Sequence, residues 1–287
     1  MDEFVTRMLR WYDDHRRDLP WRRADASPWG VLVSEVMLQQ TPVARVEPVW
    51  HEWLSRWPTP PALAADSPGE AVRAWGRLGY PRRALRLHAA ATAITQRHGG
   101  RVPSSYADLR ALPGVGDYTA AAVAAFGFGA RVAVLDTNVR RVHRRVFAGT
   151  DDSTAAPTAA ERALARDLLP ADRAPELSVA VMELGALVCT SRSPGCVRCP
   201  VESLCAWRAG GHPPAVTKRA AQRYEGTDRQ ARGRLLAVLR ERHAPVRAAD
   251  LDACWPDATQ RARALDGLVA DGLVEPLRGG RYRLPSR

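Results

Sequence analysis

Four of the five cysteines of the chain are crowded into one short segment. Their spacing is Cys189-x6-Cys196-x2-Cys199-x5-Cys205, which supplies four thiolates to a single site. Thiolates hold structural zinc and iron–sulfur clusters, and metal binding is preferred to disulfides where no secretion signal is recognised. Structural zinc sites usually present two close pairs of ligands, whereas only Cys196 and Cys199 form one here. The spacing favours an iron–sulfur cluster, with zinc as the alternative.

A glycine-containing turn, Leu112–Gly116, is predicted to join two helices. Ser105 and Asp108 form a capping pair at the start of the first helix, and the second helix begins near Asp117. The glycines permit a tight turn, so that backbone N–H groups at the start of the second helix can approach a phosphate closely. The pattern predicts a helix-hairpin-helix, and an ordinary helix–helix turn is the alternative.

A carboxylate, Asp136, follows an apolar run after this hairpin and precedes the basic run 140–145. An acid in this position is often only a helix cap. A hairpin that holds the DNA backbone, followed by a short helix and an aspartate, would place the carboxylate beside a nucleotide extruded from the duplex. This layout indicates an enzyme that acts on a DNA base.

The elements that must position these residues are predicted to be mainly α-helical. From residue 3 to about 209, apolar residues recur at helical spacing between short turns that contain proline or glycine. Strand-like alternation is nearly absent. The clearest helical segments are 28–53, 68–75, 82–98 and 159–169.

A second, smaller module is predicted at the C-terminal end. Residues 211–226 have the composition of a linker. Helical segments follow near 228–242, 248–255 and 258–272, and short strands near 273–276 and 280–284. This order predicts a winged-helix-like module over 227–287. We expect it to bind DNA through Arg261 and Arg263 of its third helix and through Arg278, Arg281 and Arg283 of its wing, with a protein-interaction module as the alternative.

The hairpin, Asp136 and the cysteine spacing together resemble the endonuclease III superfamily of DNA glycosylases. Four further stretches resemble its adenine-specific branch, the MutY family: 17–22 (RDLPWR), 34–41 (SEVMLQQT), 78–80 (LGY) and 183–186 (ELGA). The resemblance covers about residues 5–210. It implies a helix-hairpin-helix glycosylase domain over 1–210, built from two helical subdomains and a loop that binds a 4Fe-4S cluster. The N-terminal helix and 130–210 would form the cluster-bearing subdomain, and about 26–128 the helical-barrel subdomain.

The resemblance implies roles for the catalytic residues. Glu35 matches the general acid that protonates the departing adenine, and its apolar neighbours in the sequence would raise its pKa. Asp136 matches the carboxylate that stabilises the oxocarbenium-like sugar. Tyr118 and Asn138 match residues that orient Asp136.

The resemblance also implies residues that bind DNA and the extruded base. Those that contact DNA or probe the mispair are Gln39, Gln40, Thr41, Leu78, Tyr80, Pro113, Gly114, Val115 and Gly116. Those of the adenine pocket are Arg17, Leu19, Trp21, Arg22 and Glu183, with core packing as the alternative. The ligands of the cluster would be Cys189, Cys196, Cys199 and Cys205. The sequence departs from the family at Pro81, where a second aromatic is common.

Composition agrees with a folded protein that binds nucleic acid. The net charge is +11 and the sequence pI about 10.3. Nearly all of this charge is arginine, which grips phosphate through a bidentate fork, although a genome rich in arginine codons would give the same composition. With no membrane span or signal peptide recognised, we expect a cytoplasmic monomer whose partner is double-stranded DNA containing an adenine mispair.

The sequence predicts base-excision repair without strand cleavage. A glycosylase that also cleaves the strand uses an internal amine, and the superfamily's position for that amine is Tyr118 here. The single lysine, Lys218, lies in the predicted linker. The expected reaction is hydrolysis of the adenine N-glycosidic bond in A:8-oxoguanine and A:G mispairs. The alternatives are an iron–sulfur DNA-binding regulator without catalysis, and a glycosylase of the same superfamily with another base specificity.

Overall fold

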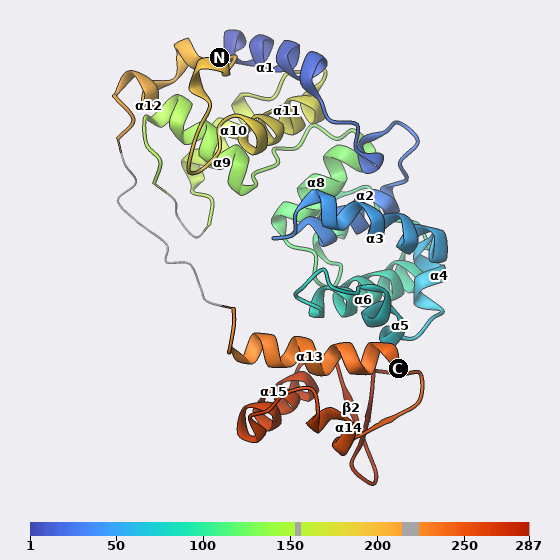
Figure 1. The fold of residues 1–287 in the computed structure, drawn as a ribbon. Helices are drawn as coiled ribbons and strands as arrows, with labels where there is room; N and C mark the ends of the chain where they lie inside the picture. Colours follow the sequence, from blue (N-terminus) through green and yellow to red (C-terminus); the bar gives the residue numbers. More distant parts are fainter. Residues whose placement is uncertain (153–155, 214–223, 287) are drawn as a thin grey trace. The chain divides into compact units, whose positions relative to one another are not determined.

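The computed structural model describes residues 1–152, 156–213 and 224–286. Its elements are almost entirely helices, which confirms the mainly α prediction (Figure 1). Part of the predicted linker, 214–223, lies outside the described residues. None of the helices described has the length and apolar content needed to span a lipid bilayer. The chain divides into two compact units.

The first unit comprises Met1–Val31, Ser104–Arg110 and Gly116–Ala220. Its core forms where one face of the N-terminal helix, carrying Phe4 and Met8, packs with the buried side chains of Val142, Leu177 and Leu184. The elements of this unit are α1 (Asp2–His15), η1 (Pro20–Arg22), α7 (Tyr106–Arg110), α8 (Asp117–Phe128), α9 (Thr137–His143), η2 (Arg144–Ala148), α10 (Ala159–Asp167), α11 (Ala174–Leu187), η3 (Cys196–Arg198), η4 (Glu202–Leu204) and α12 (Ala206–Ala209).

The second unit comprises Leu32–Pro103, Ala111–Val115 and Ala221–Arg287. Its N-terminal helices are α2 (Pro28–Leu38, most of which belongs here), α3 (Val43–Arg56), α4 (Pro60–Ala64), α5 (Pro68–Ala74) and α6 (Arg82–Arg97). The helical pattern over 28–53 is interrupted, so this segment forms two helices. Gln40 has a left-handed φ of 55°, and Pro42 caps the start of α3. Proline lacks the N–H that a continuing helix would need, which explains the break.

The C-terminal module consists of α13 (Asp228–Glu241), β1 (Val246–Arg247), α14 (Ala248–Asp252), α15 (Ala258–Ala270), β2 (Glu275–Leu277) and β3 (Arg281–Arg283) (Figure 1). The strands form an antiparallel sheet in the order β1-β3-β2. This is the element order of a winged helix and agrees with the predicted module. The sequence analysis missed β1, because two residues are too few to show an alternating pattern.

Helices α9 and α11 of the first unit approach each other closely at Gly185. A Cβ atom added there would lie 2.6 Å from the Cβ of Asn138 and 3.1 Å from its Cα. The second distance involves the main chain of α9, which cannot move aside as a flexible side chain could. The absence of a side chain at Gly185 therefore sets how closely α9 packs against α11.

We expect Gly185→Ala to lower the free energy of unfolding by about 1–3 kcal/mol, because overpacking outweighs the better helix propensity of alanine. Urea denaturation would measure this. Gly127→Ala in α8 is the matched control, since a Cβ there would meet Pro28 at an ordinary 3.4 Å. Equal stability of the two variants would contradict the proposed packing constraint.

Candidate functional site

Asp136 caps the N-terminus of α9 with its side chain. Its Oδ1 accepts a hydrogen bond from the backbone N–H of Val139 at 2.6 Å, and its Oδ2 accepts one from Asn138 Nδ2 at 2.9 Å. Burial raises the pKa of the carboxyl group, and these hydrogen bonds limit the rise. The position at a helix N-terminus also favours the negative charge. The capping interpretation is therefore correct, and the same geometry fixes the direction of the carboxylate.

Arg141 connects this carboxylate with the cysteine loop. One of its terminal nitrogens, Nη2, donates to Asn138 Oδ1 at 2.7 Å and to the carbonyl oxygen of Gly185 at 2.6 Å. Its Nε donates to the carbonyl oxygen of Cys189 at 2.8 Å. Asp136, Asn138, Arg141 and Cys189 thus form a continuous chain of hydrogen bonds. The sequence analysis placed Asn138 beside Asp136 but missed Arg141, which looked like one member of a basic run.

Tyr118 lies in the first turn of α8, directly after the hairpin. Its partly buried ring packs against a small apolar cluster that contains Ala121, Ala122 and Val134. Val134 belongs to the segment that leads into Asp136. The tyrosine therefore packs against the segment that carries the carboxylate.

Glu35 lies in the second half of α2 and is buried, with 6% of its surface exposed. Its helical neighbours Leu32, Val36 and Met37 are also buried. Glu35 therefore lies on a buried helix, and the apolar surroundings of its carboxyl group remain a prediction. Glu35 belongs to the second unit and Asp136 to the first.

Arg83 ties together two loops of the second unit that carry predicted DNA-contacting residues. Its Nη1 donates to the carbonyl oxygens of Met37 at 3.0 Å and Gln39 at 2.5 Å. Its Nη2 donates to Thr41 Oγ1 and to the carbonyl oxygen of Gly79, each at 3.0 Å. The side chain is buried, and this burial lowers the pKa of its guanidinium to about 10. A single cation thus fixes both loops.

The two loops held by Arg83 present exposed side chains in strained backbone positions. Gln40 has a φ of 55° and Tyr80 a φ of 46°, which are rare values for residues other than glycine. Both side chains are exposed, and 44% of the surface of Tyr80 is accessible. Thr41 and Leu78, by contrast, are buried and joined by a hydrogen bond from Thr41 Oγ1 to the Leu78 carbonyl oxygen. Gln40 and Tyr80 are therefore the side chains that these loops offer to a partner.

The predicted hairpin is present between α7 and α8, and α8 begins at Asp117 as expected. Ser105 Oγ accepts from the N–H of Asp108 at 3.1 Å, which confirms the predicted cap. Gly114 has a φ of 75°, and a Cβ there would lie 2.6 Å from the Cβ of Arg86. The turn therefore needs glycine for both conformation and space. Pro113, Gly114 and Val115 also border a small cavity of the second unit with Arg83 and Gln39, and Gly116 caps α8.

Three of the predicted adenine-pocket residues meet in a buried ion cluster. Glu183 is fully buried, and its two carboxylate oxygens accept from Arg17 at 2.6 and 2.7 Å and from Arg22 at 3.0 Å. Burial would raise the pKa of Glu183, but these two arginines hold it below its ordinary value. Leu19 and Trp21 are each 5% exposed and so belong to the core.

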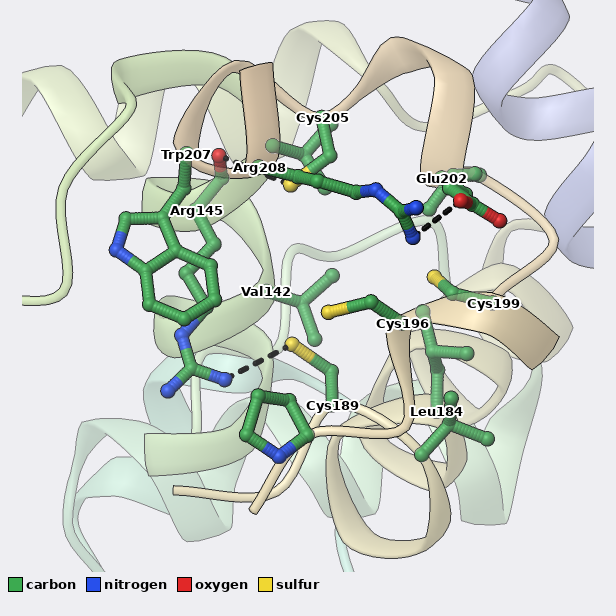
Figure 2. A pocket seen from close by; sticks show the side chains of 14 residues that line it. Val142, Arg145, Leu184, Cys189, Cys196, Cys199, Glu202, Cys205, Trp207 and Arg208 are labelled. Carbon is green, nitrogen blue, oxygen red and sulfur yellow. Dashed lines mark hydrogen bonds and ion pairs between the residues drawn. The ribbon is translucent and has the colours of Figure 1, made fainter. Parts of the chain in front are cut away.

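The four cysteines of segment 189–205 turn their thiol groups towards one space (Figure 2). Burial raises the pKa of the Cys199 thiol to about 11, and repulsion from Cys189, Cys196 and Cys205 adds to the rise. Four cysteine sulfur atoms that face one buried space match the donor set of a metal centre that binds thiolates. Within the described residues, no three His, Cys, Asp or Glu side chains are arranged to hold a single metal ion.

Arg145 contacts the start of the cysteine segment, and its role was missed in the sequence analysis. It is 1% exposed and pairs with Asp151 at 2.9 Å. It also donates to Cys189 Sγ at 3.3 Å and to the carbonyl oxygen of Thr190 at 2.8 Å, and it lies 4.4 Å from the ring of Trp207 (Figure 2). A buried cation therefore lies directly beside the thiols.

Comparison with known proteins decides the family. Residues 33–167 match the model of the HhH-GPD superfamily base excision DNA repair protein. The adenine DNA glycosylase of Mycolicibacterium smegmatis is 54% identical over 279 residues, which cover 96% of this chain and 94% of the relative. The chain belongs to the adenine DNA glycosylase family. It acts in base excision repair as a hydrolase of N-glycosyl bonds, and its substrate is DNA.

Solved structures support the same fold. The structure of a thermostable thymine-DNA glycosylase aligns with a TM-score of 0.67 at 29% identity, covering 72% of this chain and 95% of that one. A non-covalent endonuclease III–DNA complex aligns with a TM-score of 0.63 at 22% identity, covering 73% of this enzyme and 96% of its own chain. The family typically carries a 4Fe-4S cluster.

The burial of Arg83 could have been predicted from the sequence of this enzyme. Arg83 falls on the apolar stripe of α6 together with Leu87, Ala90 and Ile94, at helical spacing. An arginine within such a stripe is buried and must find hydrogen-bond acceptors. The neighbouring Arg82 lies off the stripe and is exposed.

We expect Arg83→Lys to lower the free energy of unfolding by about 2 kcal/mol, because one ammonium group cannot donate to both loops. It should also weaken binding to an adenine-mispair duplex, since Gln40 and Tyr80 lose their support. Denaturation and fluorescence anisotropy would measure the two effects. Arg82→Lys is the control, because lysine can keep the exposed ion pair with Asp271. If both variants resembled the unaltered enzyme, Arg83 would not be the tie between the loops.

Proposed function

We propose that this enzyme acts as a monomer on double-stranded DNA and removes adenine from A:8-oxoguanine and A:G mispairs by hydrolysis, without cleaving the strand. The observation that carries the proposal is the carboxylate of Asp136, held at the N-terminus of α9 by Val139 and Asn138 in a chain of the adenine DNA glycosylase family. A carboxylate with a fixed direction can stabilise positive charge that develops on a sugar.

Asp136 is proposed to stabilise the oxocarbenium-like sugar. Its hydrogen bonds oppose the effect of burial and favour the ionised form, and the approaching positive charge of the sugar favours it further. Because Asn138 is itself held by Arg141, the carboxylate does not need to reorganise when charge develops.

Glu35 is proposed to protonate the departing adenine. An adenine anion is a poor leaving group, so the base must receive a proton as the glycosidic bond breaks. A general acid must be shielded from bulk water while it transfers its proton, and Glu35 is 6% exposed. Glu35 is the buried carboxyl of α2 that has this environment.

The adenine itself is proposed to contact the segment around Arg17, Leu19, Trp21 and Arg22. Glu183 would act by orienting Arg17 and Arg22, since both of its oxygens already accept hydrogen bonds from them. Gln40 and Tyr80 are proposed to enter the duplex at the mispair, because they are exposed and their loops are rigidly held.

The proposal of hydrolysis alone rests on Tyr118. A glycosylase that cleaves the strand forms a Schiff base between an amine and the sugar. A phenol cannot form this bond, and the only lysine of the sequence is Lys218. Adenine release should therefore leave an intact strand with an abasic site.

We expect Glu35→Gln and Asp136→Asn each to slow adenine release by at least about 100-fold while duplex binding changes little. Glutamine supplies no acidic proton, and asparagine supplies no charge although it still caps a helix. Single-turnover assays on adenine opposite 8-oxoguanine and opposite guanine, with binding measured in parallel, would test this.

The controls are the same substitutions at exposed positions, Glu52→Gln on α3 and Asp14→Asn on α1. Both should release adenine at the unaltered rate. A near-normal rate in Glu35→Gln or in Asp136→Asn would remove that residue from the proposed mechanism.

Cys189, Cys196, Cys199 and Cys205 are proposed to hold a 4Fe-4S cluster. The four cysteines line one buried space, and the family typically carries such a cluster. Their spacing also contains one close pair, Cys196 and Cys199, rather than the two close pairs usual for structural zinc. When bound, the cluster would supply binding energy that stabilises the loop, which is poor in apolar side chains of its own.

Protein purified without oxygen is expected to be brown and to contain iron, and Cys199→Ser should lose iron and denature more easily. Iron and zinc analysis, visible absorption and thermal denaturation would measure these effects. Cys254→Ser is the control, because Cys254 lies outside the loop and a serine can keep its hydrogen bond to Leu251. Stoichiometric zinc without iron would overturn the proposed cluster.

A further inference from the structure

The C-terminal module is docked on the N-terminal helices of the second unit mainly through main-chain atoms. Arg73 of α5 donates to the carbonyl oxygen of Arg240 in α13. In return, Arg240 Nε donates to the carbonyl oxygen of Val72 at 2.9 Å. The backbone N–H of Gly69 donates to the carbonyl oxygen of Pro285 at 2.7 Å. These reciprocal bonds fix the module on α5.

The docked module reaches the exposed ring of Tyr80. Arg82, two residues after Tyr80, pairs with Asp271 at the end of α15 at 3.1 Å. From α13, the guanidinium carbon of Arg229 lies 4.6 Å from the centre of the Tyr80 ring and 5.8 Å from that of Tyr224. The module therefore places the guanidinium of Arg229 over the exposed ring of Tyr80.

Within the described residues, Arg229 has no carboxylate partner, in contrast to the two arginines of α15. Arg263 of α15 pairs with Asp228 at 2.6 Å, and Arg261 pairs with Asp252 at 2.8 Å. The charges of the two arginines of α15 that the sequence suggested for DNA binding, out of five in the module, are thus neutralised within the module. Arg229 is exposed, and an aromatic ring contact leaves its positive charge available to an anion.

We propose that Arg229 is a DNA-binding residue of the C-terminal module and contacts a backbone phosphate beside the mispair. This inference rests on the proposed insertion of Tyr80 into the duplex. An inserted ring stacks on bases, so the guanidinium that covers it in the free enzyme must leave the ring. Phosphates flank every base step, and arginine binds phosphate through two parallel N–H groups. The start of α13, rather than that of α15, is then a DNA-facing part of the module.

The salt dependence of binding tests the proposal, because a phosphate contact releases counterions. We compare unaltered enzyme with Arg229→Ala, Arg229→Lys and Arg234→Ala, using a duplex whose mispaired adenine nucleotide resists hydrolysis. Arg234 is the matched control, since it is an exposed arginine of the same helix but lies beside Cys254. Anisotropy titrations at several salt concentrations would give the dissociation constant and its slope.

Arg229→Ala should weaken binding about three- to tenfold and reduce the salt slope by about 0.9, whereas Arg234→Ala should change neither. Arg229→Lys should keep the slope, because it keeps the charge. The loss of slope should persist in a Tyr80→Ala background. An unchanged slope in Arg229→Ala, or an effect that vanishes without Tyr80, would overturn the proposal.

These readouts are separate from those of the proposed function. Failure of the unaltered enzyme to release adenine would contradict the proposed function, while the salt slope would still decide whether Arg229 touches phosphate. Normal adenine release together with an unchanged slope in Arg229→Ala would remove Arg229 alone.

Discussion

Buried arginines that donate to main-chain carbonyl oxygens are the constraint on which both units depend. A buried guanidinium is costly unless its N–H groups find acceptors in a fixed, planar arrangement. Arg83 satisfies this need with two loops of the second unit, and Arg141 with Asn138 and the cysteine segment of the first. Arg145 donates to Cys189 Sγ and to the carbonyl oxygen of Thr190, beside the thiols. These bonds fix the position of each loop, and the functional side chains are placed by them.

The same constraint explains how the Asp136 carboxylate can be oriented before DNA binds. Without a further partner, the side chain of a helix-capping aspartate could adopt several rotamers. Its bond to Asn138, and the bond from Arg141 to Asn138, leave one direction for the carboxylate. Burial raises the pKa of Asp136, and the hydrogen bonds from Val139 and Asn138 limit the rise.

The sequence allowed the local features to be predicted well. The cap at Ser105, the start of α8 at Asp117 and the capping geometry of Asp136 depend on neighbours within a few residues, and all are present. The ties made by Arg83 and Arg141 were not predicted. Arg141 is one member of a basic run, and the apolar stripe of α6 indicates that Arg83 is buried but not which acceptors it meets. Some of those acceptors, the carbonyl oxygens of Gln39 and Cys189, lie 44 and 48 residues away along the chain. The prediction of a helical segment over 28–53 was wrong in its extent for a local reason, because the chain turns before Pro42.

Docking through main-chain atoms has a consequence for how the C-terminal module can vary among relatives. The acceptor at Arg240 and the pair formed by Gly69 and Pro285 are peptide groups, so these bonds do not depend on the side chains of Arg240 or Pro285 as acceptors. Gly69 itself must remain glycine, because a Cβ there would lie 2.4 Å from the carbonyl oxygen of Pro285. Among the side chains, Arg73 and Arg240 supply the donors of these main-chain bonds, and Arg82 adds an ion pair with Asp271. Substitutions at other positions of the module can accumulate without changing how it docks on α5. Evolution could therefore retune the residues that face DNA while the geometry of attachment is inherited unchanged.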